Sequence, residues 1–253
     1  MILHEVNLGE KFDEIELIPI SDVHIGDAHF DEKLIKKDID YIKEKKNRFA
    51  VLNGDIMNTA TTHSVSDTYS NTLTPHGELK YARKLFKPIA DKILAVTQGN
   101  HERRIMRNDG VDMSEELAFS LGSFYKQEGL ILKIKFGDRG NGKPQVYTAY
   151  ITHGSSGASL PGGKLNKLYK MRNIVVADLY ITGHVHEKET LKKDLFIPDL
   201  RNKKVVRKTQ TFVSVGAYLD YGGYGQIKTY HPGTKGTVKI KMYAKEKNIE
   251  TIY

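Results

Sequence analysis

The chain of 253 residues contains no cysteine and no long apolar run. Without cysteine there can be no disulfide, thiolate zinc site or thiol catalysis, so any metal must be held by nitrogen and oxygen ligands. No stretch approaches the roughly 18 apolar residues that a membrane helix needs. Residues 1–11 also lack the basic and then apolar order of a signal peptide. We therefore expect a soluble, cytoplasmic protein without a membrane segment.

The chain has fewer acidic than basic residues: 31 Asp and Glu against 39 Lys and Arg, which gives a formal net charge of +8. A basic surplus favours anionic partners. Much of it lies in residues 188–208, which contain eight Lys or Arg side chains. Two interpretations remain open for this segment. It is either a solvated lysine-rich hairpin or a track that binds a phosphate backbone beside a functional site.

The first half of the chain alternates apolar runs with helical periodicity. Short apolar runs predict strands, and apolar residues at helical spacing predict helices between them. A Thr- and Ser-rich loop covers residues 58–74, and residues 99–104 are expected to form a turn. This βαβα order favours a mainly parallel sheet. The expected strands are residues 14–20, 49–52 and 93–97, and the expected helices are residues 34–42, 75–91 and 113–125.

The second half is richer in strands. Residues 130–136 and 145–151 flank a Gly-rich turn and predict a hairpin. A helix at residues 164–173 precedes a strand at 177–182, and residues 209–218 and 237–243 alternate as strands do. Neither a linker nor a low-complexity tract divides the chain. We expect one α/β domain over residues 1–253, with two mixed β-sheets packed as a sandwich and flanked by helices.

Polar side chains follow five of the apolar runs, at the point where each predicted strand ends. Carboxylates, an amide and imidazoles that meet at one sheet edge are suitable ligands for a pair of divalent metals. Residues i and i+2 of an extended segment project to the same side, so Asp22 with His24, and His184 with His186, can each offer two ligands together. The candidate ligands are Asp22, His24, Asp55, Asn100, His153, His184 and His186.

The order of these motifs resembles that of the calcineurin-like metallophosphoesterase superfamily. The motifs are Asp22-x-His24, Gly-Asp-x-x-Asn at residues 54–58, Gly-Asn-His-Glu at 99–102, His153 and Gly-His-x-His at 183–186. The Gly- and Ser-rich segment at residues 153–164 is similar to that of compact phosphoesterases of phages and prophages. The resemblance implies a four-layer α/β/β/α fold. It is specific for the superfamily but does not define a substrate.

The resemblance also implies roles for the ligands. Asp22, His24, Asp55 and His186 would hold one metal, and Asp55 would bridge to a second metal held with Asn100, His153 and His184. Two divalent ions are implied, with Mn preferred and Fe, Zn or Ni as alternatives. A hydroxide that bridges them would attack phosphorus.

His101 directly follows the candidate ligand Asn100, but in the family pattern this histidine is not itself a metal ligand. The resemblance gives it a catalytic role, in which it stabilises or protonates the leaving oxygen. The alternative is a histidine that only orients Asn100 or Asp55. Arg103 and Arg104 either neutralise phosphate oxygens or lie on a helix surface. Glu102 is better placed to hydrogen-bond the ligands and hold them in place.

Two loops carry candidate substrate contacts. His63, in the loop after Asp55, is the best candidate for a contact on the substrate side. Tyr218, Tyr221 and Tyr224 either stack on bases or pack their loop against its own sheet.

The function predicted from these residues is phosphoester hydrolysis that depends on two metals. Phosphodiesters, as in nucleic acids or nucleotides, are preferred because of the basic surplus, so a nuclease or phosphodiesterase is expected. The first alternative is a phosphatase that acts on phosphomonoesters of proteins or small molecules. The second is a binding module that holds metals and recognises phosphate or nucleic acid without turnover. The sequence does not indicate an oligomeric state.

Overall fold

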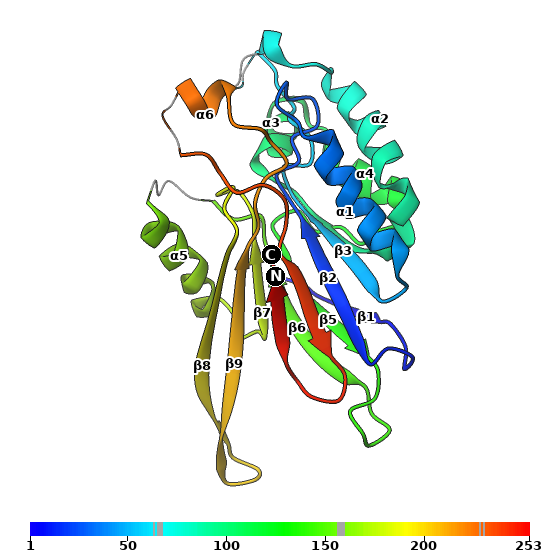
Figure 1. Cartoon of the computed structure of the whole chain (residues 1–253), viewed down its shortest axis with the longest axis vertical. Helices are drawn as coiled ribbons and strands as arrows, with labels where there is room; N and C mark the ends of the chain where they lie inside the picture. Colours follow the sequence, from blue (N-terminus) through cyan, green and yellow to red (C-terminus); the bar gives the residue numbers. More distant parts are fainter. Residues whose placement is uncertain (63, 65–67, 156–159, 228, 230) are drawn as a thin grey trace.

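Two mixed β-sheets form the centre of the protein (Figure 1). The structure is a computed structural model, and it describes the chain except for residues 63, 65–67, 156–159, 228 and 230. The six-stranded sheet has the order β1 (Leu3–Asn7), β5 (Leu130–Phe136), β6 (Gln145–Ile151), β7 (Leu179–Thr182), β9 (Lys204–Ser214) and β8 (Glu189–Asp199). The five-stranded sheet has the order β11 (Ile249–Ile252), β10 (Lys239–Tyr243), β2 (Glu14–Ile20), β3 (Arg48–Asn53) and β4 (Ile93–Thr97).

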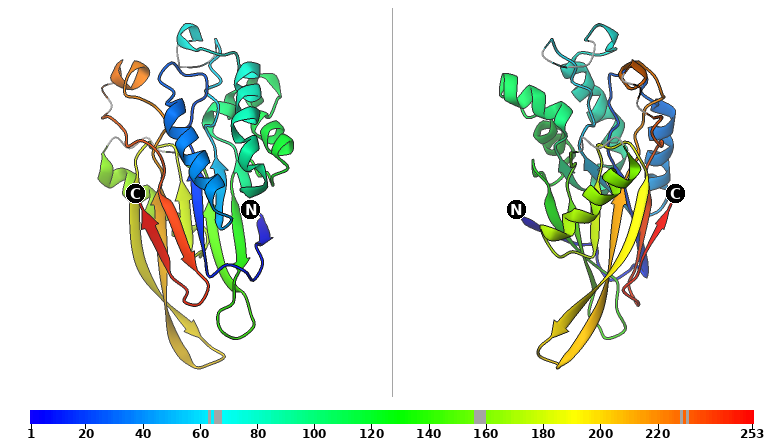
Figure 2. Two further views of the ribbon diagram at one scale, coloured as in Figure 1. Left: turned by 45° about the vertical axis from the view of Figure 1, so that its right-hand side comes forward. Right: turned by 90° about the vertical axis from the view of Figure 1, so that its left-hand side faces the viewer.

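Helices cover the outer faces of both sheets (Figure 2). The helices α1, α2 and α4 pack on the five-stranded sheet, and α5 packs on the six-stranded one. The described helices are α1 (Glu32–Glu44), α2 (Pro75–Phe86), α3 (Asn100–Asp109), α4 (Met113–Leu121), α5 (Pro161–Lys170) and α6 (Gly223–Ile227), with 3₁₀ turns at Thr68–Ser70, Lys87–Lys92 and Met171–Asn173. The predicted fold class, two mixed sheets flanked by helices, is confirmed.

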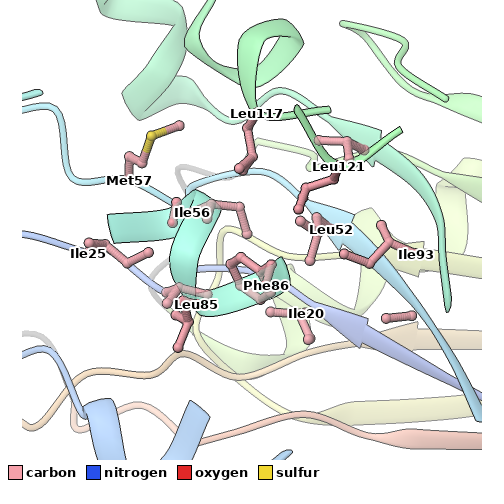
Figure 3. Packing of buried hydrophobic residues seen from close by; sticks show 14 of the residues in the cluster. Ile20, Ile25, Leu52, Ile56, Met57, Leu85, Phe86, Ile93, Leu117 and Leu121 are labelled. Carbon is pink, nitrogen blue, oxygen red and sulfur yellow. The ribbon is translucent and has the colours of Figure 1, made fainter. Parts of the chain in front are cut away.

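Alternation along the central strands explains the layers. In β2, Ile15 and Leu17 face the other sheet, whereas Ile18 and Ile20 face the helices. Because successive side chains of a strand point to opposite faces, β2 supplies apolar surface to two cores at once. The core under the helices includes Ile20, Leu52, Phe86 and Leu117, which belong to the cluster of buried side chains drawn in Figure 3. This packing holds the carboxyl ends of β2, β3 and β4 in a fixed arrangement.

Several boundaries differ from the sequence expectation. Residues 99–104, expected as a turn, form the first part of α3, because Gly99 caps that helix and Glu102 reaches back to the Gly99 N–H. The helix expected over residues 113–125 ends at Leu121, because Gly122 adopts a left-handed φ of 66°. The strands β1 and β11 were not predicted, because each is an edge strand of only five or four residues and has no long alternating pattern. No described helix is long and apolar enough to cross a membrane.

Candidate metal centre

The predicted ligands gather at the carboxyl ends of five strands. Asp22 and His24 follow β2, Asp55 follows β3, and His153 follows β6. Asn100 opens α3 after β4, and the two remaining histidines follow β7. The strands β2, β3 and β4 are parallel, as are β6 and β7, so within each sheet these ends lie at the same edge. In an α/β sheet this edge is the usual position of a ligand site.

The nitrogen and oxygen atoms of these side chains converge in three overlapping groups. In each group the atoms lie within 4.8 Å of one another, and Asp55 belongs to two of the groups. Asn100 joins through its Oδ1, which lies 3.2 Å from His153 Nε2 and 2.8 Å from His184 Nδ1. The groups are Asp22, His24 and His186; His24, Asp55 and His101; and Asp55, His153 and His184.

The backbone of the ligand residues is unusual. Among the described residues, eight that are not glycine have a positive φ, and five of them are candidate ligands. The left-handed region costs a non-glycine residue roughly 1–3 kcal/mol, and such strain concentrates at functional sites. Tertiary packing therefore holds these side chains in positions that the chain alone would not favour. The five are Asp22, His24, Asp55, His184 and His186, with φ between 50° and 69°.

This backbone corrects the expectation that extended i, i+2 pairs would each bind together. Asp22 and His24 do converge, but through left-handed residues beyond the end of β2. His184 and His186 diverge instead. His184 turns toward Asn100 and His153, whereas His186 Nε2 lies 3.1 Å from Asp22 Oδ1. The Gly-His-x-His motif therefore contributes one imidazole to each of two ligand groups.

Two glycines allow this close packing. A Cβ on Gly99 would lie 2.1 Å from Asp55 N and Oδ1, and a Cβ on Gly183 would lie 2.0 Å from Ser21 Oγ and 2.5 Å from Asp22 Oδ2. Contacts that short do not occur, so any larger residue would displace a ligand carboxylate. The glycines before Asn100 and His184 are thus required by the approach of the backbone to the site.

Glu102 holds the Asp55 turn in place. Its buried carboxylate accepts hydrogen bonds from the backbone N–H groups of Asp55 (3.1 Å), Met57 (2.9 Å) and Gly99 (3.1 Å). Burial and the nearby charge of Asp55 raise the pKa of Glu102 to about 7. Glu102 therefore supports the candidate ligands without facing the site.

The orientation of His153 fits a bound cation. Its Nδ1 lies 2.8 Å from the carbonyl oxygen of Asn53 and donates to it in the neutral ring. Nε2 faces Asp55 Oδ2 at 3.2 Å and Asn100 Oδ1 at 3.2 Å. These two oxygens need a positive partner, which is the proton on His153 in the metal-free protein and would be a metal cation in its place. The donor set, imidazole with carboxylate and amide oxygen, suits a first-row divalent metal.

The electrostatics of the site agree with a need for positive charge. Burial opposes ionisation of Asp22, but His186 and His153 beside it lower its pKa to about 2. Burial likewise disfavours the charged form of His153, yet the carboxylates of Asp55 and Asp22 raise its pKa to about 10. The two buried carboxylates thus stay ionised and attract cations.

His101 lies beside the ligands with its ring fixed from behind. Its backbone N–H donates to Asp55 Oδ1 (2.9 Å), and its Nε2 lies 3.9 Å from Asp55 Oδ2. On the other side, Nδ1 lies 2.8 Å from the Asn58 carbonyl oxygen and 2.6 Å from Arg104 Nη2. Burial lowers the pKa of His101, although Asp55 acts in the opposite direction. The structure also places His101 in one of the ligand groups, with His24 and Asp55.

The predicted substrate contacts differ in position. Arg104 is partly buried, and Nη2 donates to the Asn58 carbonyl oxygen (3.0 Å), so it reaches the site from behind His101. Arg103 is exposed on α3, with no contact to the ligands among the described residues. His63 lies outside the described residues.

The tyrosines of the Gly-rich loop divide in the same way. Tyr218 is buried and donates its hydroxyl to Asp38 Oδ2 (2.9 Å), so it packs the loop and is not available for stacking. Tyr221 is 50% exposed, and the side chain of Tyr224 lies outside the described residues.

Sequence reasoning missed the residues that orient His153. Ser21 Oγ lies 3.4 Å from His153 Nδ1 and donates to the Asn53 carbonyl oxygen (2.9 Å). A serine before Asp22 is only a weak indication of this role. A contact made by a backbone carbonyl cannot be recognised from a sequence, because every residue has a carbonyl group. Contacts between residues about 130 positions apart become visible only in the folded chain.

Histidine and carboxylate side chains gathered at the strand ends of a two-sheet α/β fold are typical of hydrolases that use metal ions. A model of the calcineurin-like phosphoesterase family matches residues 20–225. The chain therefore belongs to the calcineurin-like phosphoesterase family. A search of curated proteins found no match.

Solved structures with a similar fold include Vps29 of Entamoeba histolytica complexed with zinc, at 13% identity and a TM-score of 0.41 over 94% of this chain and 98% of that one. A metallophosphoesterase of Sphaerobacter thermophilus has 12% identity and a TM-score of 0.41 over 94% and 89% of the two chains. A predicted phosphoesterase of Streptococcus pneumoniae TIGR4 has 15% identity and a TM-score of 0.37 over 91% and 83%.

Divalent metal is expected to stabilise the metal-free protein, because a ligand that binds only the folded state shifts the unfolding equilibrium. At a free concentration of about 100 Kd the gain is about 2.7 kcal/mol. For a chain of this size that corresponds to a rise in Tm of about 5–10 °C. Thermal melts of EDTA-treated protein with added Mn²⁺, Zn²⁺ or Ni²⁺ measure the shift.

The matched variants are His153→Gln, which removes a candidate ligand, and His76→Gln, which alters an exposed histidine of α2. The shift should shrink in the first and persist in the second. An unchanged Tm with all three metals, or equal shifts in both variants, would contradict the assignment of the site.

Proposed function

We propose that this protein is a phosphoester hydrolase that depends on two divalent metal ions and acts on phosphodiesters. The observation that carries the proposal is that His24 and Asp55 each belong to two of the three candidate groups, so that Asp55 lies between the Asp22, His24 and His186 group and the His153 and His184 group. A carboxylate shared in this way can bridge two ions. In the proposed assignment Asp22, His24, Asp55 and His186 hold one ion, and Asp55, Asn100, His153 and His184 hold the other.

When bound, the ions supply Lewis acidity and lower the pKa of a water at the site. We propose Mn²⁺ as the metal, because a mixture of imidazole, carboxylate and amide ligands suits it, with Fe, Zn and Ni as alternatives. The left-handed backbone at five ligand residues supports the assignment, since it keeps the ligands oriented before any ion arrives.

In this proposal His101 acts as a general acid that protonates the leaving oxygen. Its Nε2 is on the ligand side, and its Nδ1 contacts both Asn58 O and Arg104. The proposal requires Nδ1 to accept from Arg104 and not to donate to the Asn58 carbonyl oxygen 2.8 Å away, because only then does the neutral ring carry its proton on Nε2, toward the site. Arg104 is therefore a positioning residue for His101, and its guanidinium adds positive charge behind the ring.

The phosphodiester preference rests on the number of charges. A nucleic acid carries many phosphates along its backbone, and a chain with 39 basic against 31 acidic residues favours such a polyanion over a small monoester. We also propose that residues 1–253 act as one domain, since the two sheets share one apolar core that joins strands from both halves of the chain.

The test compares two chromogenic esters, bis(p-nitrophenyl) phosphate and p-nitrophenyl phosphate, with Mn-loaded and EDTA-treated protein. We expect hydrolysis of the diester that requires metal and exceeds hydrolysis of the monoester. Faster turnover of the monoester would reject the diester preference. If neither ester is hydrolysed while elemental analysis finds two ions per chain, the protein is a binding module and not an enzyme.

A further inference from the structure

The strands β8 and β9 form a ribbon that extends beyond the rest of the protein. Each strand has eleven residues, and they pair along their whole length from Glu189–Ser214 to Asp199–Lys204. β9 also pairs with β7, but only over Thr211–Ser214. Beyond that point the described residues give β9 no strand partner except β8. Figures 1 and 2 show the free part of the ribbon projecting at the end away from α3 and α6.

This ribbon carries exposed apolar side chains that a two-stranded structure does not bury. Phe196 is 69% exposed, Leu200 84% and Val205 65%. Phe196 and Val205 lie on one face, and Leu200 lies at the turn. Isolated two-stranded ribbons are at best marginally stable in water. Gathered apolar residues at such a tip mark a contact surface.

The charge of the ribbon selects the kind of partner. Residues 188–208 contain eight Lys or Arg and three Asp or Glu. Lys193, Arg201, Lys203 and Lys204 are all exposed, and none has an ion pair within the part of the chain that the structure describes. A second copy of this chain would bring two positive ribbons together, which like-charge repulsion disfavours. These exposed cations therefore favour an anionic partner.

The positions of the basic side chains on the ribbon favour one kind of anionic partner over another. Lys193 and Lys204 lie on one face, and Arg201 and Lys203 lie in the turn. Lys192 and Arg207 lie on the other face, where Arg207 forms an ion pair with Asp194. A lipid surface would contact mainly the tip. A ribbon inside a nucleic-acid groove has phosphates on both sides, which matches basic residues on both faces. The major groove of B-DNA is wide enough to admit a two-stranded ribbon.

We propose that the β8–β9 ribbon is an arm that binds the groove of double-stranded nucleic acid. It rests on the proposed function, because it names duplex phosphodiester as the substrate class. The base of the arm follows the His186 ligand by three residues, and its tip lies about 35 Å away at 3.3 Å per residue. The arm therefore contacts the duplex over about ten base pairs from the metal centre, with Leu200 in the turn toward the base edges.

The test measures binding of a fluorescent 20-base-pair DNA duplex by the full chain in EDTA, which prevents cleavage, across a series of salt concentrations. The arm variant combines Lys193→Gln, Arg201→Gln, Lys203→Gln and Lys204→Gln. At about 0.1 M salt its Kd should rise at least about tenfold. The slope of log Kd against log salt should fall by about 3 to 4, because each phosphate contact contributes about 0.9.

The matched control makes the same loss of four charges on α1, where the side chains are exposed but far from the arm: Lys33→Gln, Lys36→Gln, Lys37→Gln and Lys43→Gln. It should keep most of the affinity and of the salt slope. Circular dichroism melts verify that both variants are folded. Equal loss in the two variants, or none in the arm variant, would overturn the proposal.

Two further readouts separate the remaining explanations. Duplexes of 6, 10 and 20 base pairs should bind with affinity that rises steeply up to about ten base pairs. If the arm variant instead loses binding to phosphatidylserine vesicles and keeps duplex binding, the ribbon belongs to a lipid surface and the proposal is wrong. Hydrolysis of bis(p-nitrophenyl) phosphate by the unsubstituted chain tests the proposed function separately. Ester hydrolysis without duplex binding that depends on the arm rejects only the proposed role of the arm. Duplex binding that depends on the arm without ester hydrolysis rejects only the proposed enzymatic function.

Discussion

Asp55→Asn is expected to lower kcat for bis(p-nitrophenyl) phosphate by about 10³-fold. The loss of a bridging charge removes several kcal/mol of transition-state stabilisation, and each 1.36 kcal/mol is a factor of ten. The substitution keeps the shape of the side chain, whose Oδ1 accepts the His101 N–H at 2.9 Å and whose Oδ2 lies 3.2 Å from His153 Nε2. It removes the charge that both ligand groups share.

The measurement pairs steady-state kinetics at saturating Mn²⁺ with elemental analysis after gel filtration. Asp55→Asn should retain fewer ions per chain than the parent. Asp27→Asn is the matched control, since Asp27 lies in the neighbouring loop and hydrogen-bonds the backbone and ring of His29 without joining a ligand group. It should retain two ions and most of the activity. Near-normal turnover by Asp55→Asn with both ions bound would show that Asp55 is not a bridge.

His101→Gln is expected to lower kcat by about 10²–10⁴-fold, the usual contribution of a positioned acid or base. The loss should depend on the leaving group. A nitrophenolate leaves without much assistance, whereas an alkoxide needs a proton, so methyl p-nitrophenyl phosphate should be affected less than a dialkyl or nucleic-acid diester. KM and metal content should change little, because the ring of His101 is not among the ligands assigned to either ion.

The alternative for His101 is visible in the structure, since it lies within ligand distance of His24 and Asp55. Elemental analysis decides between the roles. Loss of an ion from His101→Gln would make His101 a ligand or the support of one, and equal losses for good and poor leaving groups would also reject the acid. His29→Gln, which changes a partly exposed histidine that belongs to none of the candidate ligand groups, is the matched control and should show neither change.

Much of the fold followed from local patterns. The apolar runs at residues 14–20 and 93–97 are the strands β2 and β4, because buried strands need continuous apolar sequence. Residues 99–104 were misassigned as a turn, since a Gly-Asn-His-Glu segment has no apolar period. In the folded chain, Glu102 bonds the N–H groups of three residues and makes that segment the start of α3.

The inference from i, i+2 spacing failed for a similar reason, although the family resemblance already assigned His184 and His186 to different ions. An i, i+2 spacing defines a common side only for extended backbone, and His184 and His186 have left-handed φ values of 69° and 54°. No propensity of histidine favours that region strongly enough to predict it. The contacts of His184 with Asn100 and of His186 with Asp22 determine it.

Arg104 shows the same limit at a single side chain. Its position in the sequence, three residues after His101, is equally compatible with a helix surface and with the site. Only the packing of α3 against the turn at Asn58 directs its guanidinium to the Asn58 carbonyl oxygen and to His101. Arg103, its neighbour, is turned by about 100° around the helix axis and remains exposed.

The sequence by itself determined the chemical types of the candidate ligands, their order at the ends of successive strands, and the two-sheet architecture, because each depends on residue identity and on periodicity within short segments. The tertiary structure decided how those ligands group, which side chains orient them, and that residues 188–208 form part of a projecting arm. Those features depend on contacts between residues far apart in the chain, such as Asp22 with His186 and Asn53 with His153, which exist only after the two sheets have packed.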